Sequence, residues 1–175
     1  KYGPAAVYRG GLMVRTSLDI QAQQAAEEIV KRRIEQLAPY HVNNGALVAM
    51  LPWSGEIIAM VGSADFYNDA IDGQYNVAIA ERQPGSAIKP VTYLTAFEKA
   101  GWYPGTIVFD YAKVWNIPGF GRYAPRNATG QHFGAITVRE ALANSLNIPA
   151  LQAIEVVGVP AMIDMAHRLG IKTGF

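Results

Sequence analysis

Several features that would define a chemistry are missing from this sequence. There is no cysteine among its 175 residues, which excludes disulfides, thiolate nucleophiles and cysteine-ligated zinc. The three histidines, His41, His132 and His167, lie too far apart in sequence to form a local metal-binding motif. We therefore expect neither a metal ion nor a cofactor.

The sequence also lacks an excess of charge and a long apolar run. Its 15 lysines and arginines nearly balance 14 acidic residues, so we do not expect nucleic acid as a partner. No stretch approaches the roughly 18 consecutive apolar residues of a membrane span, and the start of the chain does not resemble a signal peptide. We expect the chain itself to be soluble, although a piece of a larger secreted or anchored protein would have the same composition.

The first half of the sequence contains an amphipathic helix and two apolar runs. Apolar residues recur at helical spacing from Ile20 to Leu37, and Asp19 can cap this helix. Residues 46–51 are wholly apolar, a second run that is apolar after its first residue extends from Glu56 to Val61, and a turn containing proline and glycine separates them. These runs predict an antiparallel hairpin, and because neither run alternates, we expect it to be covered on both faces.

The second half is predicted to be mainly helical. Helices are expected over 86–100, 137–143, 149–157 and 160–169, and the aromatic-rich stretch 102–133 reads as loops and short strands. Half of all residues are hydrophobic, enough to fill a core and to exclude global disorder. The order of elements favours an α+β fold in which helices pack on an antiparallel sheet.

Ser86 and Lys89 form the first candidate catalytic pair. Residues three apart on a helix lie on one face, with Cβ atoms about 5 to 6 Å apart. A lysine kept neutral by burial and by its neighbours can take the proton of a serine that attacks a carbonyl. We expect the amine of Lys89 to face a solvated cleft. Such a pair also occurs by chance about 0.2 times in a sequence of this composition, so alone it is weak evidence.

Ser145 and Asn147 form a second candidate pair, at the break where Asn147-Ile148-Pro149 interrupts the helices. Both side chains can project from a helix end into one cleft. The hydroxyl could pass a proton between the lysine and a leaving amine, and the amide could hold a substrate amide. The simpler alternative is that both residues only cap the helix break.

The combined motifs resemble the transpeptidase domain of class A, bifunctional penicillin-binding proteins, over almost the whole chain. The segment Gly10-Gly11-Leu12 with Thr16-Ser17-Leu18-Asp19 resembles the entry into that domain, although Ser17 stands where threonine is usual. The residues that carry the main resemblance are Tyr75-Asn76, Arg82-Gln83-Pro84-Gly85-Ser86-Ala87-Ile88-Lys89-Pro90, Thr137-Val138-Arg139-Glu140-Ala141-Leu142 and Ser145-Leu146-Asn147-Ile148-Pro149-Ala150.

This resemblance implies a D,D-transpeptidase that cross-links peptidoglycan stem peptides and is acylated by β-lactams. Ser86 would be the nucleophile, Lys89 the base, Ser145 the proton relay and Asn147 the holder of a substrate amide. Residues 1–44 would form a linker segment with the amphipathic helix, and 45–175 the N-terminal part of a domain with the fold shared by penicillin-binding proteins and serine β-lactamases. The parent protein would be extracytoplasmic and anchored to the bacterial membrane, with other cell-wall synthesis proteins as possible partners.

One feature departs from the family pattern. The family has a third motif, Lys-Thr/Ser-Gly, on a strand far downstream of the second. Here Lys172-Thr173-Gly174 begins only 27 residues after Ser145 and directly follows a predicted helix. We interpret it as unrelated to that motif, and we expect the chain to stop before the true one and to be weakly active or inactive alone.

Two other functions remain open from the sequence. One is a non-catalytic module that binds β-lactams or peptidoglycan as a sensor. The other is a serine β-lactamase or D,D-carboxypeptidase, which hydrolyses the acyl-enzyme; no glutamate here has the setting that class A β-lactamases use to activate water.

Overall fold

The computed structural model describes residues 3–173, which divide into two compact units, one ending at Glu81 and the other beginning at Arg82. The first unit contains α1 (Gly3–Arg9), α2 (Ile20–Leu37), β1 (Leu47–Met50) and β2 (Ile57–Val61). It also has short 3-10 helices at Ala38–Tyr40, Asp69–Ile71 and Val77–Ile79. The predicted boundary at residue 45 between linker and domain stays a prediction.

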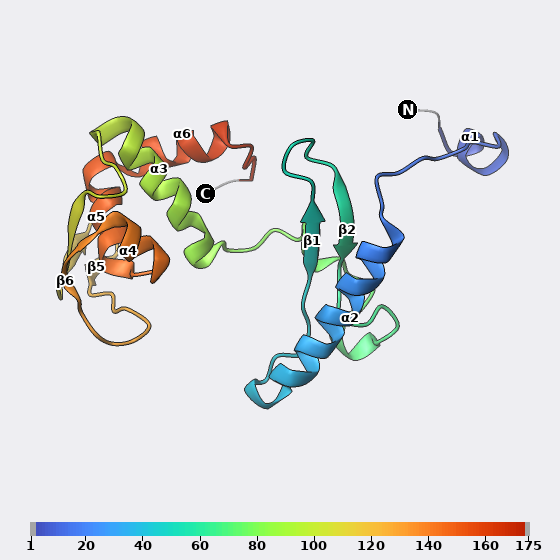
Figure 1. The fold of residues 1–175 in the computed structure, drawn as a ribbon, viewed down its shortest axis with the longest axis horizontal. Coiled ribbons are helices and arrows are strands. Elements are labelled where there is room, and N and C mark those ends of the chain that lie inside the picture. The colour runs from blue at the N-terminus through green and yellow to red at the C-terminus, as the bar shows by residue number, and fades with distance from the viewer. Residues whose placement is uncertain (1–2, 174–175) are drawn as a thin grey trace. The chain divides into compact units, whose positions relative to one another are not determined.

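Helix α2 has the predicted limits and the predicted cap. The Asp19 side chain accepts a hydrogen bond from the Ala22 N–H at 3.0 Å, which satisfies one of the free N–H groups of the first turn. The helix packs along the β1–β2 hairpin, as Figure 1 shows. The buried residues between them are Ala26, Val30, Ala59 and Val61.

The hairpin is antiparallel, as predicted, but only one of its faces is covered. Its strands pair Leu47 with Val61 and Val48 with Met60, and no third strand joins them in the part of the chain that the structure describes. Burial alternates along both strands, because α2 packs on one side while Val48 and Met50 remain exposed on the other. The expectation of a hairpin covered on both faces is therefore not met within these residues.

The second unit is a helical cluster with two small antiparallel sheets. β3 (Ile107–Asp110) pairs with β6 (Gly134–Thr137), and β4 (Trp115–Ile117) pairs with β5 (Gly121–Tyr123). The helices are α3 (Lys89–Ala100), preceded by a 3-10 helix at Gly85–Ile88, α4 (Val138–Ala143), α5 (Asn147–Val157) and α6 (Val159–Arg168). Thr137 and Glu140 form the predicted capping box at the start of α4.

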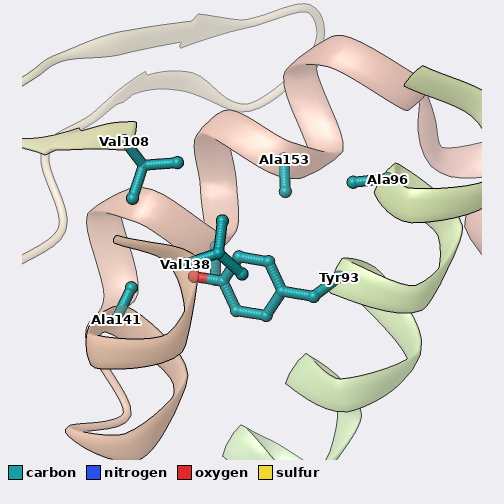
Figure 2. Close-up of a cluster of buried hydrophobic side chains, with 7 residues drawn as sticks. Tyr93, Ala96, Val108, Val138, Ala141 and Ala153 are labelled. Atoms are coloured by element: carbon teal, nitrogen blue, oxygen red, sulfur yellow. The ribbon is translucent and has the colours of Figure 1, made fainter. Parts of the chain in front are cut away.

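The core of this unit lies between α3, α4, α5 and β3. Figure 2 shows Tyr93 pointing from α3 into a cluster of small side chains from the other elements. The cluster consists of Tyr93, Ala96, Val108, Val138, Ala141, Ala150 and Ala153. Small residues let the helices approach closely, which fixes the first turn of α3 relative to the α4–α5 junction. These are the two segments that carry the candidate site.

In residues 3–173, no single helix is long and apolar enough to cross a membrane. Only α5 and α6 taken together reach that length and composition, and they are bent by 96° at Gly158.

Candidate active site

Ser86 lies in the 3-10 helix that leads directly into α3. Gly85 before it has φ +53°, a left-handed conformation that glycine adopts more readily than other residues. Pro90 falls in the first turn of α3, where no hydrogen bond from its backbone nitrogen is required. The Ser86 side chain is exposed, and its hydroxyl makes no hydrogen bond to any residue from 3 to 173. The local fold thus presents a free hydroxyl at the start of the helix.

Lys89, one helical turn later, is only 7% exposed. Burial lowers the pKa of its amine below 10.5, because the charged form loses hydration. The expectation that this amine faces a solvated cleft is therefore wrong. Lys89 is the first residue of α3, and its amine reaches the junction between α4 and α5. A buried lysine with a lowered pKa is better suited to act as a base than an exposed one.

The amine of Lys89 has three acceptors, all from the second candidate pair. It donates to the Ser145 carbonyl oxygen at 2.5 Å, to the Ser145 Oγ at 3.2 Å and to the Asn147 Oδ1 at 2.7 Å. Three acceptors match the three protons of an ammonium group. The structure thus brings Lys89, Ser145 and Asn147 into contact. In the described residues, the Lys89 backbone N–H donates to the Ser86 carbonyl, but no side-chain hydrogen bond joins the Ser86 hydroxyl to the Lys89 amine.

Ser145 occupies a constrained position between the two helices. Its φ is +51°, which is unusual for a residue with a side chain and is maintained only where the surroundings impose it. Its N–H donates to the Leu142 carbonyl at 3.0 Å, and the N–H of Leu146 reaches back to Ala141 at 2.9 Å. This tight turn directs both the carbonyl and the hydroxyl of Ser145 toward Lys89.

The sequence placed Asn147 in the break between the helices, but in the structure Asn147 is the first residue of α5. The break consists of residues 144–146, and Pro149 is tolerated in the first turn of α5. The half-buried side chain of Asn147 accepts from Lys89 and donates through Nδ2 to the Arg126 carbonyl at 2.7 Å. Both ends of this amide thus have partners within the chain, and its role in holding substrate stays a prediction.

Sequence reasoning missed the residues behind Asn147. Asn127 accepts the Asn147 N–H, and Asp110 in turn binds the Asn127 amide. Both residues are buried, yet they belong to the aromatic-rich stretch without periodicity that was expected to be loops and short strands. The only available signal was that Asp110 ends the short apolar run of residues 107–109.

Lys172 and Thr173 follow α6 without forming a strand, and Gly174 lies outside the described residues. The interpretation that this triplet is unrelated to the family's third motif stays a prediction. A cavity of about 670 Å³ lies in the first unit, between α2, β2 and residues 62–76, and contains none of the four candidate residues.

The comparison with protein families shows to which family the chain belongs. Residues 45–174 match the family model "Penicillin binding protein transpeptidase domain". The chain belongs to the penicillin-binding protein transpeptidase family. The predicted resemblance to this family is thereby confirmed.

Two relatives show the extent of the similarity to penicillin-binding proteins. The chain is 35% identical over 130 residues to penicillin-binding protein 1A of Rickettsia typhi, which covers 74% of this chain and 16% of that protein. It is 34% identical over 165 residues to penicillin-binding protein 1B of Vibrio cholerae, which covers 93% of this chain and 21% of that protein. The chain thus spans about a fifth or less of the length of these relatives.

The fold is also that of a penicillin-binding protein. The structure of PonA1 from Mycobacterium tuberculosis in complex with penicillin V matches with a TM-score of 0.74 and 27% identity, covering 99% of this chain and 43% of that one. The predicted α+β architecture of helices and antiparallel strands is confirmed by this match.

Proposed function

We propose that the protein containing this chain is a D,D-transpeptidase that cross-links peptidoglycan stem peptides through an acyl-enzyme on Ser86. One observation carries the proposal: a buried lysine, one helical turn after an exposed serine hydroxyl, contacts Ser145 and Asn147. Family membership and the penicillin V complex of PonA1 support this chemistry. The same site would be acylated by β-lactams, whose strained amide imitates the D-Ala-D-Ala bond.

Acylation would begin with proton transfer from Ser86 to Lys89. The Ser86 oxygen bonds to the penultimate D-Ala carbonyl carbon, and its proton passes to the neutral Lys89 amine. Lys89 must therefore first lose a proton and release one of its three acceptors, so that its lone pair can face the serine. Burial, which lowers its pKa, reduces the free energy required for this step.

Release of the first product would require the proton to return. The tetrahedral intermediate collapses as the carbon–nitrogen bond to the terminal D-Ala breaks, and the leaving amine takes a proton from Lys89 through the Ser145 hydroxyl. The distance of 3.2 Å between the Lys89 Nζ and the Ser145 Oγ is compatible with this relay.

An amine on a second stem peptide would then attack the ester. A new amide bond forms, the bond between the carbonyl carbon and the Ser86 oxygen breaks, and the serine regains its proton from the attacking amine through the same two groups. The products are a cross-linked peptide and free D-Ala, and the enzyme returns to its starting state.

The proposed function also carries expectations about location and partners. The substrate is extracytoplasmic, so we propose that the protein acts outside the cytoplasm, anchored to the membrane by parts other than the described helices. Other cell-wall synthesis proteins would be its partners. A non-catalytic sensor of β-lactams is the second candidate, because in the described residues the Lys89 amine makes its hydrogen bonds to Ser145 and Asn147 and none to the Ser86 hydroxyl.

The test is a transpeptidation assay on the full-length protein. It is supplied with a donor stem peptide ending in D-Ala-D-Ala and with an acceptor amine, and Ser86→Ala serves as the control. A transpeptidase forms cross-linked product and releases one D-Ala for each cross-link. Acylation without turnover would favour the sensor, and hydrolysis of the acyl group within minutes without cross-linking would favour a β-lactamase or carboxypeptidase.

A further inference from the structure

The first residue of α5 is held by a loop outside the candidate motifs. Its N-cap residue, Leu146, has no side-chain oxygen to accept the free N–H groups of the first turn. Asn127 supplies that acceptor from a distance of 20 residues in sequence, with 2.8 Å between its Oδ1 and the Asn147 nitrogen. The neighbouring Arg126 carbonyl accepts from the Asn147 Nδ2 at 2.7 Å.

The first of these contacts fixes the backbone of Asn147, and the second orients its side-chain amide. With its nitrogen on the Arg126 carbonyl, its oxygen is directed at the Lys89 amine, 2.7 Å away. A rotation of this amide by half a turn would place an N–H donor against the ammonium group and would break its hydrogen bonds to Lys89 and to the Arg126 carbonyl. Residues 126 and 127 therefore set the direction of one of the three acceptors of Lys89.

Asn127 is itself fixed by a buried carboxylate. Asn127 is 4% exposed, and its Nδ2 lies 2.9 and 2.8 Å from the two carboxylate oxygens of Asp110. Asp110, at the end of β3, is fully buried and also accepts the Phe133 N–H at 2.9 Å, while the His132 ring lies 3.8 Å away. Hydrogen bonds to a charged acceptor are stronger than neutral ones, and a buried carboxylate is strongly disfavoured without them. The Asp110–Asn127 pair is therefore a rigid support for the first residue of α5, Asn147.

We propose that Asn127, held by Asp110, is a positioning residue for the acylation of Ser86. The path runs from Asp110 through Asn127 to the backbone N–H of Asn147, and from the Asn147 side-chain oxygen to the Lys89 amine, with a hydrogen bond of 2.7 to 2.9 Å at each step. Asn127 does not contact the reacting atoms in this path; it holds the base in the geometry that acylation requires. The inference rests on the proposed function, in which Lys89 is the base.

Two readouts test this role in the full-length protein. The first is the rate of acylation by a fluorescent penicillin, resolved into the limiting rate and the concentration for half-saturation. The second is the reactivity of Lys89 toward acetic anhydride, followed by mass spectrometry, which requires no enzymatic activity. Asn127→Ala is expected to lower the limiting rate about 10- to 100-fold with little change in half-saturation, and to raise Lys89 modification at least about 10-fold.

Two sets of variants separate positioning from general loss of stability. Val108→Ala lies on the same strand as Asp110 and weakens the core without touching the hydrogen-bond path. It should lower stability while leaving both readouts at the parent values in the folded protein. If Asn127→Ala does not fold, Asp110→Asn replaces it, because the asparagine has nearly the same shape and can still accept the Phe133 N–H.

A reciprocal exchange provides the rescue. Asn127→Asp places two carboxylates together and should lower the limiting rate of acylation. Adding Asp110→Asn restores one carboxylate–amide pair, in which residue 110 donates the hydrogen bond and residue 127 accepts it. The double variant should recover most of the lost rate and of the Lys89 protection. The proposal is overturned if Asn127→Ala behaves like Val108→Ala in both readouts, or if the exchange recovers neither. If the parent forms no adduct, the proposed function fails, and Lys89 modification alone decides whether Asn127 positions the lysine.

Discussion

Replacement of Lys89 by two different residues separates its catalytic role from its structural one. Lys89→Met keeps a side chain of similar length but removes the amine, whereas Lys89→Ala also removes three buried carbons. The burial of Lys89 makes this comparison informative, because an exposed lysine would contribute little to stability in either form.

The magnitudes follow from the contacts. Both variants leave the Ser145 carbonyl and the Asn147 Oδ1 without their donor, and each hydrogen bond to a charged group contributes about 1.5–3 kcal/mol. Relief of the buried amine offsets part of this loss, so we expect Lys89→Met to be about 1–3 kcal/mol less stable than the parent. Loss of three buried carbons at about 0.8 kcal/mol each should make Lys89→Ala less stable by a further 2.4 kcal/mol or so.

The two assays are denaturant unfolding and acylation by a fluorescent penicillin, both on the full-length protein. The limiting rate of acylation should fall about 10²- to 10⁴-fold in both variants, because neither has a base for Ser86. Equal stability of the methionine and alanine variants would contradict the burial argument. A normal acylation rate in Lys89→Met would refute the assignment of Lys89 as the base.

Three further predictions concern Ser145, pH and the last part of the chain. Ser145→Gly should be about 1 kcal/mol more stable than Ser145→Ala in denaturant unfolding, because a φ of +51° strains alanine more than glycine. Both variants lose the relay hydroxyl and should be acylated slowly. An alanine variant that is more stable than the glycine variant would contradict this prediction. Because burial lowers the pKa of Lys89, the folded protein binds fewer protons than the unfolded chain at pH values between that lowered pKa and 10.5. In this pH window, the free energy of unfolding of the parent, measured relative to that of Lys89→Met, should therefore rise with pH. A difference that falls with pH would exclude the lowered pKa. Lys172→Ala should label with penicillin like the parent, and a loss as severe as that of Ser86→Ala would show that Lys172 belongs to the site.

The sequence predicted the elements with strong periodicity and local capping signals. Helix α2 and the capping box at Thr137 are determined by residues within one or two helical turns, and the structure has them where the pattern placed them. Helix α1 lies in residues 3–9, where glycine and proline gave no helical signal, and it was not predicted.

The candidate site was predictable in its motifs but not in its environment. The spacing of Ser86 and Lys89 indicated the chemistry, but the burial of Lys89 depends on α4 and α5, which lie about 50 residues away in sequence. The support from Asp110 and Asn127 is likewise formed by tertiary contacts across a stretch without periodicity. Sequence patterns reveal local periodicity, whereas contacts between residues far apart in the sequence do not alter that periodicity and cannot be predicted from it.

In the proposed mechanism, Ser86 is the residue that forms the acyl-enzyme. The most direct measurement is mass spectrometry of proteolytic peptides after reaction of the full-length protein with a fluorescent penicillin, alongside Ser86→Ala. Because Ser86 is exposed and its hydroxyl makes no hydrogen bond in residues 3–173, this variant should stay within about 0.5 kcal/mol of the parent in stability. A single adduct is expected, on Ser86, and it should be absent from the variant. An adduct on another serine, or labelling that persists in Ser86→Ala, would contradict it.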